Sequence, residues 1–230
     1  MPLTNKTIML DLDSTLIFTS DNFDNYTDLE LYSNPKHMYL RNHIYKFDVI
    51  DVVDKPGTGV KSSMWGIMRP HVNEFLDFCF DYFANVIVWS AGQLRYVHAI
   101  CDVLFTDPEK QPCLIWSYDD CEKTDNFLYK PLMKIPEQAF PSIGLDKIFA
   151  LDDNEITFSK NKDNALHIPP YEPELTPKGI VEDDPTLLNL TRWLMLPEVM
   201  EASDVREINK EQCFTCEEDF DNISDYFENL

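Results

Sequence analysis

The sequence predicts an α/β protein in which a parallel sheet is flanked by helices. Short apolar runs at 7–10, 85–89, 113–118 and 147–151 are typical of buried strands, and helical periodicity separates several of them. Strands that alternate with helices form parallel sheets with helices on both faces. Two more strand-like runs around a turn rich in Gly and Pro predict a small β-hairpin insert after the first strand, within residues 18–68.

The insert has two parts with different patterns. Residues 18–44 are polar and aromatic without a clean period, which predicts a loop or flap beside the end of the first strand. Residues 45–53 and 63–68 are strand-like and flank the Gly- and Pro-containing segment 54–59. This arrangement predicts two antiparallel strands joined by that turn.

Four segments have the features of helices. Pro fits the first helical turn, so the first helix is expected to open at Pro70, and the second covers residues 94–104. A third helix is expected to begin at Pro131, although Pro136 shortens or breaks it. An acidic start and a Pro precede a fourth apolar helix at 187–196.

The length of 230 residues suits one full-sized domain with a small additional element. We therefore expect a main domain over residues 1–196 and an acidic C-terminal segment over residues 197–230. No apolar run approaches the length of a transmembrane helix, and the first residues lack the pattern of a secretory signal. The expectation is an intracellular protein, cytoplasmic or nuclear, without a membrane partner.

The formal net charge of -22 is concentrated near the C-terminus, where residues 171–230 hold sixteen Asp and Glu against four Lys and Arg. Such a balance disfavours direct binding to nucleic acids, because phosphate backbones attract Lys and Arg. It is compatible with a basic protein partner for the acidic segment. A solvated tail that aids solubility is the simpler interpretation.

The cysteines allow three interpretations. Cys213 and Cys216 form a single C-x-x-C, which could be a redox pair or could join Cys113 and Cys121 in a structural zinc site. A reduced pair without special function is the simplest of the three. The five histidines show no metal-binding spacing, and we assign none of them to a site.

Acidic and hydroxyl side chains follow three of the predicted strands. Asp11 and Asp13 come directly after the first strand, and residues i and i+2 of an extended chain point the same way. Ser90 follows the second strand, and Asp152 and Asp153 follow the fourth. Because sites in parallel sheets lie beyond the carboxyl ends of the strands, we expect these side chains to share one edge.

These residues suit phosphoryl transfer, which needs a nucleophile, charge neutralisation and help for the leaving group. Asp11 can attack phosphorus to form an aspartyl-phosphate, and Asp13 can protonate the leaving oxygen and later activate water. Ser90 can donate a hydrogen bond to the phosphoryl group, whose charge Lys130 can neutralise. The all-oxygen ligand set of a Mg²⁺ ion would be Asp11, Asp152, Asp153 and the main-chain carbonyl of Asp13.

Each residue also has a structural interpretation when it is taken alone. The aspartates could form turns, Ser90 could cap the following helix, and Lys130 could lie on the surface. For Arg69 we favour a structural salt bridge over peptide binding. Arg95 and Tyr96 could line a substrate groove or could pack in the core or at its rim.

Six stretches together carry a family resemblance. They are Leu10-Asp11-Leu12-Asp13-Ser14-Thr15-Leu16, Arg69-Pro70-His71-Val72-Asn73-Glu74-Phe75-Leu76, Val88-Trp89-Ser90-Ala91-Gly92 with Tyr96, Tyr129-Lys130, Leu151-Asp152-Asp153 and Asp163-Asn164-Ala165. Over roughly residues 6–195 the chain resembles the haloacid-dehalogenase superfamily of phosphotransferases. More narrowly it resembles the phosphatases of the RNA polymerase II C-terminal domain, of the small, TFIIF-associated and NLI-interacting-factor-like types.

The resemblance implies a Rossmann-like haloacid-dehalogenase fold and a role for each matching residue. Asp11 would be the nucleophile, Asp13 the acid and base, and Asp153 the second magnesium side chain, with Asp152 supporting the site. The substrate in that family is a phosphoserine or phosphothreonine in a peptide. Two departures are visible, since position 14 is Ser where the narrower family usually has Glu, and residues 116–121 lack the Arg that assists substrate recognition.

The residues predict a Mg²⁺-dependent phosphatase. The resemblance implies that its substrate is a phosphoserine or phosphothreonine in a protein, with the polymerase C-terminal domain as a candidate. One alternative is a phosphatase of a small metabolite or nucleotide, which would need a capping domain rather than an open hairpin insert. Another is a non-catalytic binding module, against which the presence of both Asp11 and Asp13 argues.

Overall fold

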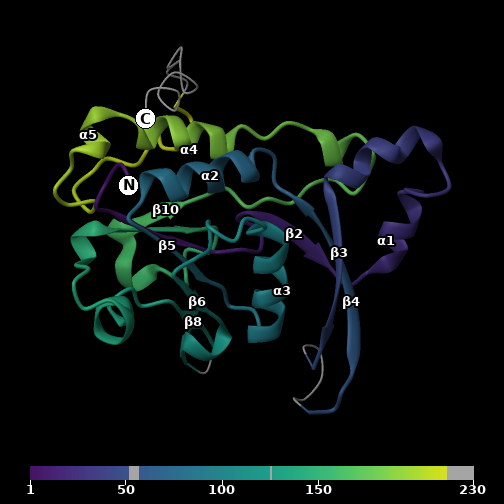
Figure 1. Cartoon of the computed structure of the whole chain (residues 1–230), viewed down its shortest axis with the longest axis horizontal. Helices are drawn as coiled ribbons and strands as arrows, with labels where there is room; N and C mark the ends of the chain where they lie inside the picture. The colour runs from purple at the N-terminus through teal and green to yellow at the C-terminus, as the bar shows by residue number, and fades with distance from the viewer. Residues whose placement is uncertain (52–56, 125, 217–230) are drawn as a thin grey trace.

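The computed structural model describes residues 1–51, 57–124 and 126–216 (Figure 1). Its centre is a five-stranded parallel sheet with the strand order β10-β9-β1-β5-β6. These strands are β1 (Thr7–Leu10), β5 (Asn85–Trp89), β6 (Leu114–Trp116), β9 (Ile148–Asp152) and β10 (Ala165–His167). The expected parallel sheet is confirmed, and β10 is an edge strand that the sequence did not predict.

The register of the sheet aligns the ends of its central strands. Leu10, the last residue of β1, pairs with Val88 of β5 and Leu151 of β9. All four residues of β1 are buried, as are all five of β9. The polar residues that follow these strands are thereby brought to the same edge of the sheet.

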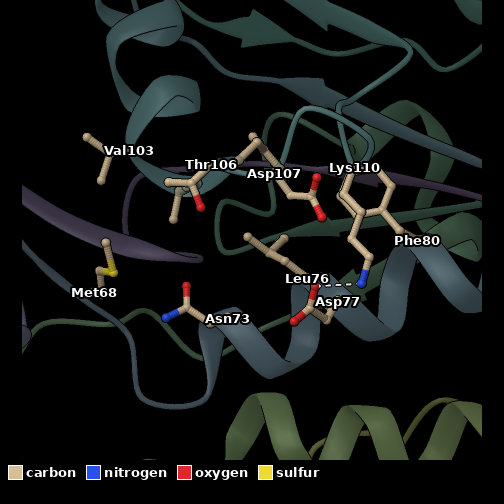
Figure 2. Close-up of a pocket in the computed structure, with 11 residues that line it drawn as sticks. Met68, Asn73, Leu76, Asp77, Phe80, Val103, Thr106, Asp107 and Lys110 are labelled. Carbon is tan, nitrogen blue, oxygen red and sulfur yellow. Dashed lines mark hydrogen bonds and ion pairs between the residues drawn. The ribbon is translucent and has the colours of Figure 1, made fainter. Parts of the chain in front are cut away.

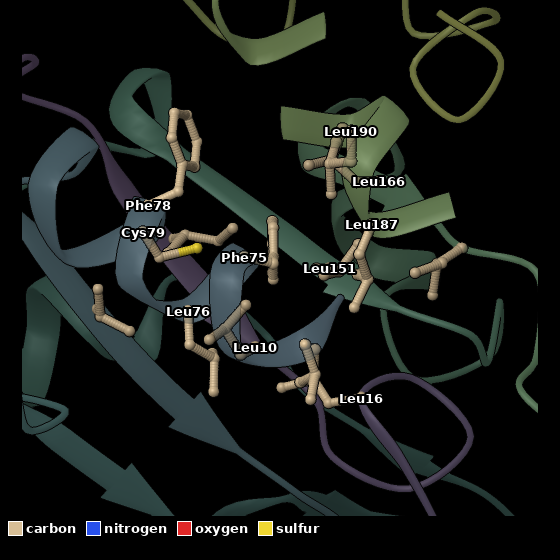
Figure 3. Packing of buried hydrophobic residues seen from close by; sticks show 14 of the residues in the cluster. Leu10, Leu16, Phe75, Leu76, Phe78, Cys79, Leu151, Leu166, Leu187 and Leu190 are labelled. Carbon is tan, nitrogen blue, oxygen red and sulfur yellow. The ribbon is translucent and has the colours of Figure 1, made fainter. Parts of the chain in front are cut away.

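The two faces of the sheet are covered differently. Ile8 and Leu10 belong to a core with three α-helices, α2 (Val72–Tyr82), α3 (Leu94–Leu104) and α4 (Thr186–Leu194), of which α2 and α4 are seen in Figure 3. Met9, Ile87 and Ala150 face a second core. Its cover comes from β8 (Leu128–Tyr129) and the short helical turns η3 (Ile135–Ala139) and η4 (Leu145–Lys147). Cys121 also belongs to this core and lies between η2 (Tyr118–Asp120) and β7 (Glu122–Lys123), the strand that pairs with β8.

The prediction of a helix that begins at Pro131 is wrong in the type of helix. The structure has one π-helical turn there, η3, with Pro136 near its start. Proline lacks a backbone N–H and cannot continue a regular ladder of helical hydrogen bonds. The other three predicted helices are present, and α4 is followed by the short helix α5 (Pro197–Met200). The predicted start of the first helix at Pro70 is wrong, because His71 is the N-cap in a left-handed conformation and α2 begins only at Val72.

The insert forms a second, three-stranded antiparallel sheet with the order β2-β4-β3, and Figure 1 shows it at the side of the molecule that carries α1. The predicted hairpin is confirmed as β3 and β4, although residues 52–56 of the region around its turn lie outside the described residues. The loop expected at 18–44 is wrong, because this part of the chain is structured. It contains most of β2, together with α1 and a 3-10 helix. The bounds of these elements are β2 (Ile17–Ser20), α1 (Phe23–Asp28), η1 (Pro35–Asn42), β3 (Ile44–Ile50) and β4 (Lys61–Met68).

Residues beyond 196 also pack on the main core. Val199, Val205, Cys213 and Cys216 are buried among the residues of the helical face. The division of the chain at residue 196 remains a prediction, and the rest of the acidic segment, 217–230, lies outside the described residues. The remaining 3-10 turns of the C-terminal half are η5 (Ser159–Asn164) and η6 (Gly179–Val181).

None of the helices in the described parts of the chain has the length and apolar character needed to cross a bilayer.

Candidate active site

The loop after β1 aims two carboxylates into one cavity. The Asp11 amide donates to the carbonyl of Leu151 at 2.9 Å, which continues the sheet pairing by one residue. The chain then turns sharply, and Ser14 adopts a left-handed conformation with a φ of 57°. Asp11 and Asp13 line a cavity of about 390 Å³. Leu12 between them is buried in the core, as alternation along an extended chain requires.

The other predicted site residues line the same cavity, although far-separated parts of the chain supply them. They are Ser90, Lys130, Asp152 and Asp153, joined by Ala91, Gly92, Asn154 and Thr157. The structure thus brings all six sequence-predicted site residues together beyond the carboxyl end of the central sheet.

Lys130 connects two of the carboxylates. Its ammonium lies 2.5 Å from Asp11 Oδ1 and 2.7 Å from Asp152 Oδ2, and the residue is only 1% exposed. Burial by itself lowers the pKa of Lys130, but the charges of Asp11 and Asp152 outweigh it and hold the pKa above its ordinary value. The neighbouring Asp11 and Asp152 therefore favour the charged form of Lys130.

Three carboxylates are close enough to share a cation. One oxygen from each of Asp11, Asp152 and Asp153 lies within 4.8 Å of the others. Carboxylate oxygens are the ligands of hard divalent cations such as Mg²⁺, so this donor set fits that metal.

Burial raises the pKa of Asp11. The positive charge of Lys130 opposes this rise, and the negative charges of Asp152 and Asp13 add to it.

The two neighbouring aspartates differ in what they already bind. Asp152 accepts hydrogen bonds from Lys130, from Thr157 Oγ1 at 2.8 Å and from the Asn154 amide at 2.9 Å. Asp153 accepts one from Thr15 Oγ1 at 3.3 Å, and the same hydroxyl lies 3.3 Å from Asp11 Oδ2. Asp153 consequently has more free acceptor capacity toward a cation than Asp152.

Asp13 is held by a hydrogen-bond network from the insert and α3. The Tyr96 hydroxyl donates to Asp13 Oδ1, and the hydroxyls of Thr19 and Tyr45 lie 2.6 Å apart beside it. Burial raises the pKa of Asp13, against the opposing effect of hydrogen bonds from Tyr96 and Thr19. Tyr96 is 6% exposed, so it packs in the core and also reaches the site.

Ser90 lies in the tight turn that follows β5. Its amide donates to the carbonyl of Trp116 at 3.1 Å, and its Oγ accepts from the Gly92 amide at 3.0 Å. The N-cap of α3 is Gln93, so Ser90 stabilises its own turn rather than capping that helix.

Arg69 supports the loop after β1 from outside the cavity. Its guanidinium is 2.8 Å from Asp184 and donates to the carbonyl of Thr15 at 2.9 Å. The residue is buried, and the predicted structural salt bridge is confirmed. Arg95 in contrast is exposed, and its guanidinium pairs with Asp51 of the insert at 3.2 Å.

Sequence reasoning missed two supporting residues, and one of the cysteine interpretations that it left open is not formed. Thr15 stands inside the D-x-D-x-T motif and could have been identified there, whereas nothing around Thr157 marks it in the sequence. The zinc site is wrong, because the only clustered metal-binding group among the described residues is the aspartate trio. Cys113, Cys121, Cys213 and Cys216 are free thiols and do not gather.

The chain has a central parallel sheet flanked by helices, and its site residues come from four motifs that follow one another along the chain. This combination defines an α/β protein of the haloacid-dehalogenase-like class. The family model of NLI interacting factor-like phosphatases matches residues 6–206. The chain belongs to this family and is a CTD phosphatase-like protein.

Comparisons with individual proteins agree with this assignment. Protein 355R of Invertebrate iridescent virus 3, which is named as CTD phosphatase-like, is 25% identical over 207 residues, covering 86% of this chain and 96% of the viral protein. The fission yeast RNA polymerase II CTD phosphatase Fcp1, solved as a variant bound to beryllium fluoride, is 19% identical with a TM-score of 0.59. That likeness covers 74% of this chain but only 42% of the Fcp1 chain.

A second Fcp1 structure, described as that of an essential RNA polymerase II CTD phosphatase, gives the same TM-score of 0.59 and covers 43% of its chain. At 19% identity these two likenesses concern the fold.

Proposed function

We propose that this protein is a Mg²⁺-dependent phosphoserine/phosphothreonine protein phosphatase that acts through an aspartyl-phosphate on Asp11. The observation that carries the proposal is the placement of Lys130 between Asp11 and Asp152 in the cavity that Asp13 also lines. A nucleophilic carboxylate, a second carboxylate for proton transfer and a fixed cation are the parts that such a reaction needs.

The side chains that would hold Mg²⁺ are Asp11 and Asp153, with the main-chain carbonyl of Asp13. Asp152 would support the site by orienting Lys130, because its oxygens already accept three hydrogen bonds. When bound, Mg²⁺ would orient the phosphate and shield it from the negative charge of Asp11.

The first chemical step forms a bond from an Asp11 carboxylate oxygen to phosphorus and breaks the bond from phosphorus to the serine or threonine oxygen. Asp13 gives its proton to that leaving oxygen, so the alcohol departs neutral. Lys130 and Ser90 stabilise the transferred phosphoryl oxygens through charge and hydrogen bonding.

In the second step Asp13 takes a proton from a water molecule, which attacks the same phosphorus. The bond between Asp11 and phosphorus breaks, and inorganic phosphate and the free Asp11 carboxylate result. The first step needs Asp13 near the oxygen of the departing alcohol, and the second needs it near the attacking water. The hydrogen bond from Tyr96 supports that position of Asp13.

A phosphorylated segment of a protein is the substrate class that we favour over a small metabolite. The insert combines a three-stranded sheet with α1 and η1, and none of its described residues lines the cavity. An extended peptide can enter a cavity whose rim is left open. The names of the viral relative and of Fcp1 make the RNA polymerase II C-terminal domain the first substrate to test.

The test is hydrolysis of para-nitrophenyl phosphate with and without Mg²⁺, beside Asp11→Asn and the control Asp21→Asn in the exposed part of the insert. We expect turnover that requires Mg²⁺, is lost in Asp11→Asn and is unchanged in the control. A panel of phosphoserine, phosphothreonine and sugar-phosphate substrates then separates protein from metabolite substrates. Equal activity of wild type and Asp11→Asn would exclude the mechanism, and a preference for sugar phosphates would exclude the substrate class.

A further inference from the structure

A groove separate from the active site lies between α2 and the segment that ends α3. Its volume is about 260 Å³. Figure 2 shows side chains of α2, among them Asn73, Leu76 and Asp77, on one side and Val103 and Thr106 on the other. Neither the proposed reaction nor the loop after β1 uses these residues.

The floor of the groove is apolar and already formed. The buried part consists of Leu76, Leu104 and Phe105, and the half-buried part of Met68, Phe80 and Val103. The rings of Phe80 and Phe105 meet edge to face with their centroids 6.0 Å apart. An apolar side chain that binds here would be removed from contact with water, and the core residues would not have to move.

The rim of the groove is acidic. Asp77 and Asp107 line it and are exposed, and Glu109 is exposed close by in the sequence. Lys110 is the one cation among the described lining residues. It is already engaged, 2.8 Å from Asp77 and 4.0 Å from Asp81.

The size of the groove favours an amino-acid side chain over a whole small molecule as its ligand. Small-molecule sites usually have volumes of roughly 300–1,000 Å³. A volume of about 260 Å³ is below that range and suits one or two apolar side chains of a peptide. The acidic rim would attract basic residues on either side of such an anchor.

We propose that this groove docks a segment of the phosphorylated substrate protein in which a large apolar side chain is flanked by Lys or Arg. A chain with a formal charge of -22 repels a phosphorylated substrate at long range. Basic docking residues offset this repulsion and hold the phosphorylated residue near the site at a raised effective concentration. The effect on turnover rests on the proposed phosphatase function, whereas binding to the groove does not.

The distance between groove and site sets the spacing of the docking segment. Val103 follows Tyr96 by seven residues on α3, so the two lie ~10 Å apart along the helix axis at the usual rise per residue. About three or more extended residues are needed to span that distance. A docking segment directly adjacent to the phosphorylated residue is therefore too close to reach the groove.

The experiment uses the full chain and a fluorescein-labelled, unphosphorylated peptide with the sequence Lys-Arg-Leu-Phe-Lys-Arg. Fluorescence anisotropy should show binding that weakens as salt is raised, because exposed charges are screened. Val103→Arg, which puts bulk and a cation into the groove, should weaken binding at least ~10-fold, the equivalent of losing one buried apolar anchor. Asp107→Asn, beyond the end of α3, should weaken binding less than Val103→Arg does. The matched control Asp102→Asn, on α3 but outside the groove lining, should weaken it least.

The kinetic arm joins the same peptide to a phosphoserine segment through Gly-Ser spacers of different length. With a long spacer, kcat/KM should exceed that of the phosphoserine segment alone by roughly tenfold, and Val103→Arg should remove this advantage. Hydrolysis of para-nitrophenyl phosphate by Val103→Arg should equal that of wild type. Peptide binding without any hydrolysis would leave docking intact and overturn the phosphatase function.

Hydrolysis without peptide binding would overturn the docking proposal alone. Equal binding by wild type and Val103→Arg would do the same. A shift from dimer to monomer in Val103→Arg, measured by sedimentation and without peptide binding, would assign the groove to a second copy of the chain instead.

Discussion

The hydroxyl of Tyr96 on α3 donates a hydrogen bond to the carboxylate of Asp13 in the loop after β1. This bond joins a helix of the main domain to the residue proposed to transfer protons. Ring contact between Tyr96 and Phe47 of β3, with centroids 6.0 Å apart, extends the link to the insert. The insert therefore supports the site as well as flanking it.

Replacing Tyr96 should affect substrates according to their leaving groups. In Tyr96→Phe, Asp13 keeps its hydrogen bond from Thr19 but loses one fixed partner. We expect kcat for a phosphoserine peptide to fall roughly tenfold, a part of the 10²–10⁴-fold that general acid catalysis supplies. The rate with 2,4-dinitrophenyl phosphate, whose leaving group needs no proton, should be nearly unchanged. Equal losses on both substrates would show that Tyr96 has only a packing role.

Removing the Lys130 ammonium should cost both stability and activity. Lys130→Met leaves the Asp11 and Asp152 carboxylates without their shared cation, and breaking a buried ion pair typically costs about 3–5 kcal/mol. Urea unfolding measures this loss. The double variant Lys130→Met/Asp152→Asn should recover part of the stability but none of the activity. Recovery of turnover in the double variant would contradict the role of Lys130 on the phosphate.

Binding of Mg²⁺ should be measurable without turnover. A ligand that binds only the folded state raises the free energy of unfolding by RT ln(1 + [L]/Kd). Millimolar Mg²⁺ should therefore raise the melting temperature of wild type, and Asp153→Asn should lose most of this rise. Asp152→Asn is the matched control, and we expect it to keep more of the rise because Asp152 already accepts three hydrogen bonds. The opposite order would exchange the roles of the two residues.

The ion pair between Arg69 and Asp184 should make stability depend on pH in the acid range. Burial by itself raises the pKa of Asp184, but hydrogen bonds from Thr186 and the charge of Arg69 outweigh it and hold the pKa below its ordinary value. A lowered folded-state pKa stabilises the protein above the unfolded value of about 3.9, and this stabilisation is lost as pH falls through the folded-state pKa.

We therefore expect Asp184→Asn to lower the free energy of unfolding by about 2 kcal/mol at pH 7 and at pH 5, a figure reduced for the partial exposure of Asp184. The difference from wild type should shrink below about pH 4 as Asp184 becomes protonated. Asp183→Asn is the control, since the neighbouring carboxylate is exposed and contacts only His71 among the described hydrogen bonds. A pH-independent difference would rule out titration of Asp184 as its source.

Local patterns in the sequence were sufficient for most of the fold. The buried strands at 85–89 and 147–151 are apolar runs of ordinary strand length, and α3 has a clear apolar face, so periodicity alone predicts them. The errors fall where the pattern is short or ambiguous. Four-residue β2 has too few positions to show a period, and it forms because it pairs with β4.

The sequence by itself determined the chemical groups of the candidate site, because strand ends and the order of the motifs are local properties of the chain. Only the tertiary structure decided what surrounds each group. Thr157 orients Asp152, and Tyr96 reaches Asp13 from 83 residues away, through contacts that no local pattern records. The same holds for the cysteines. Their spacing permits a zinc site, but the three segments that carry them do not pack together to form one. Side chains distant in sequence meet only when the sheet and its helices are packed, so their contacts belong to the fold as a whole.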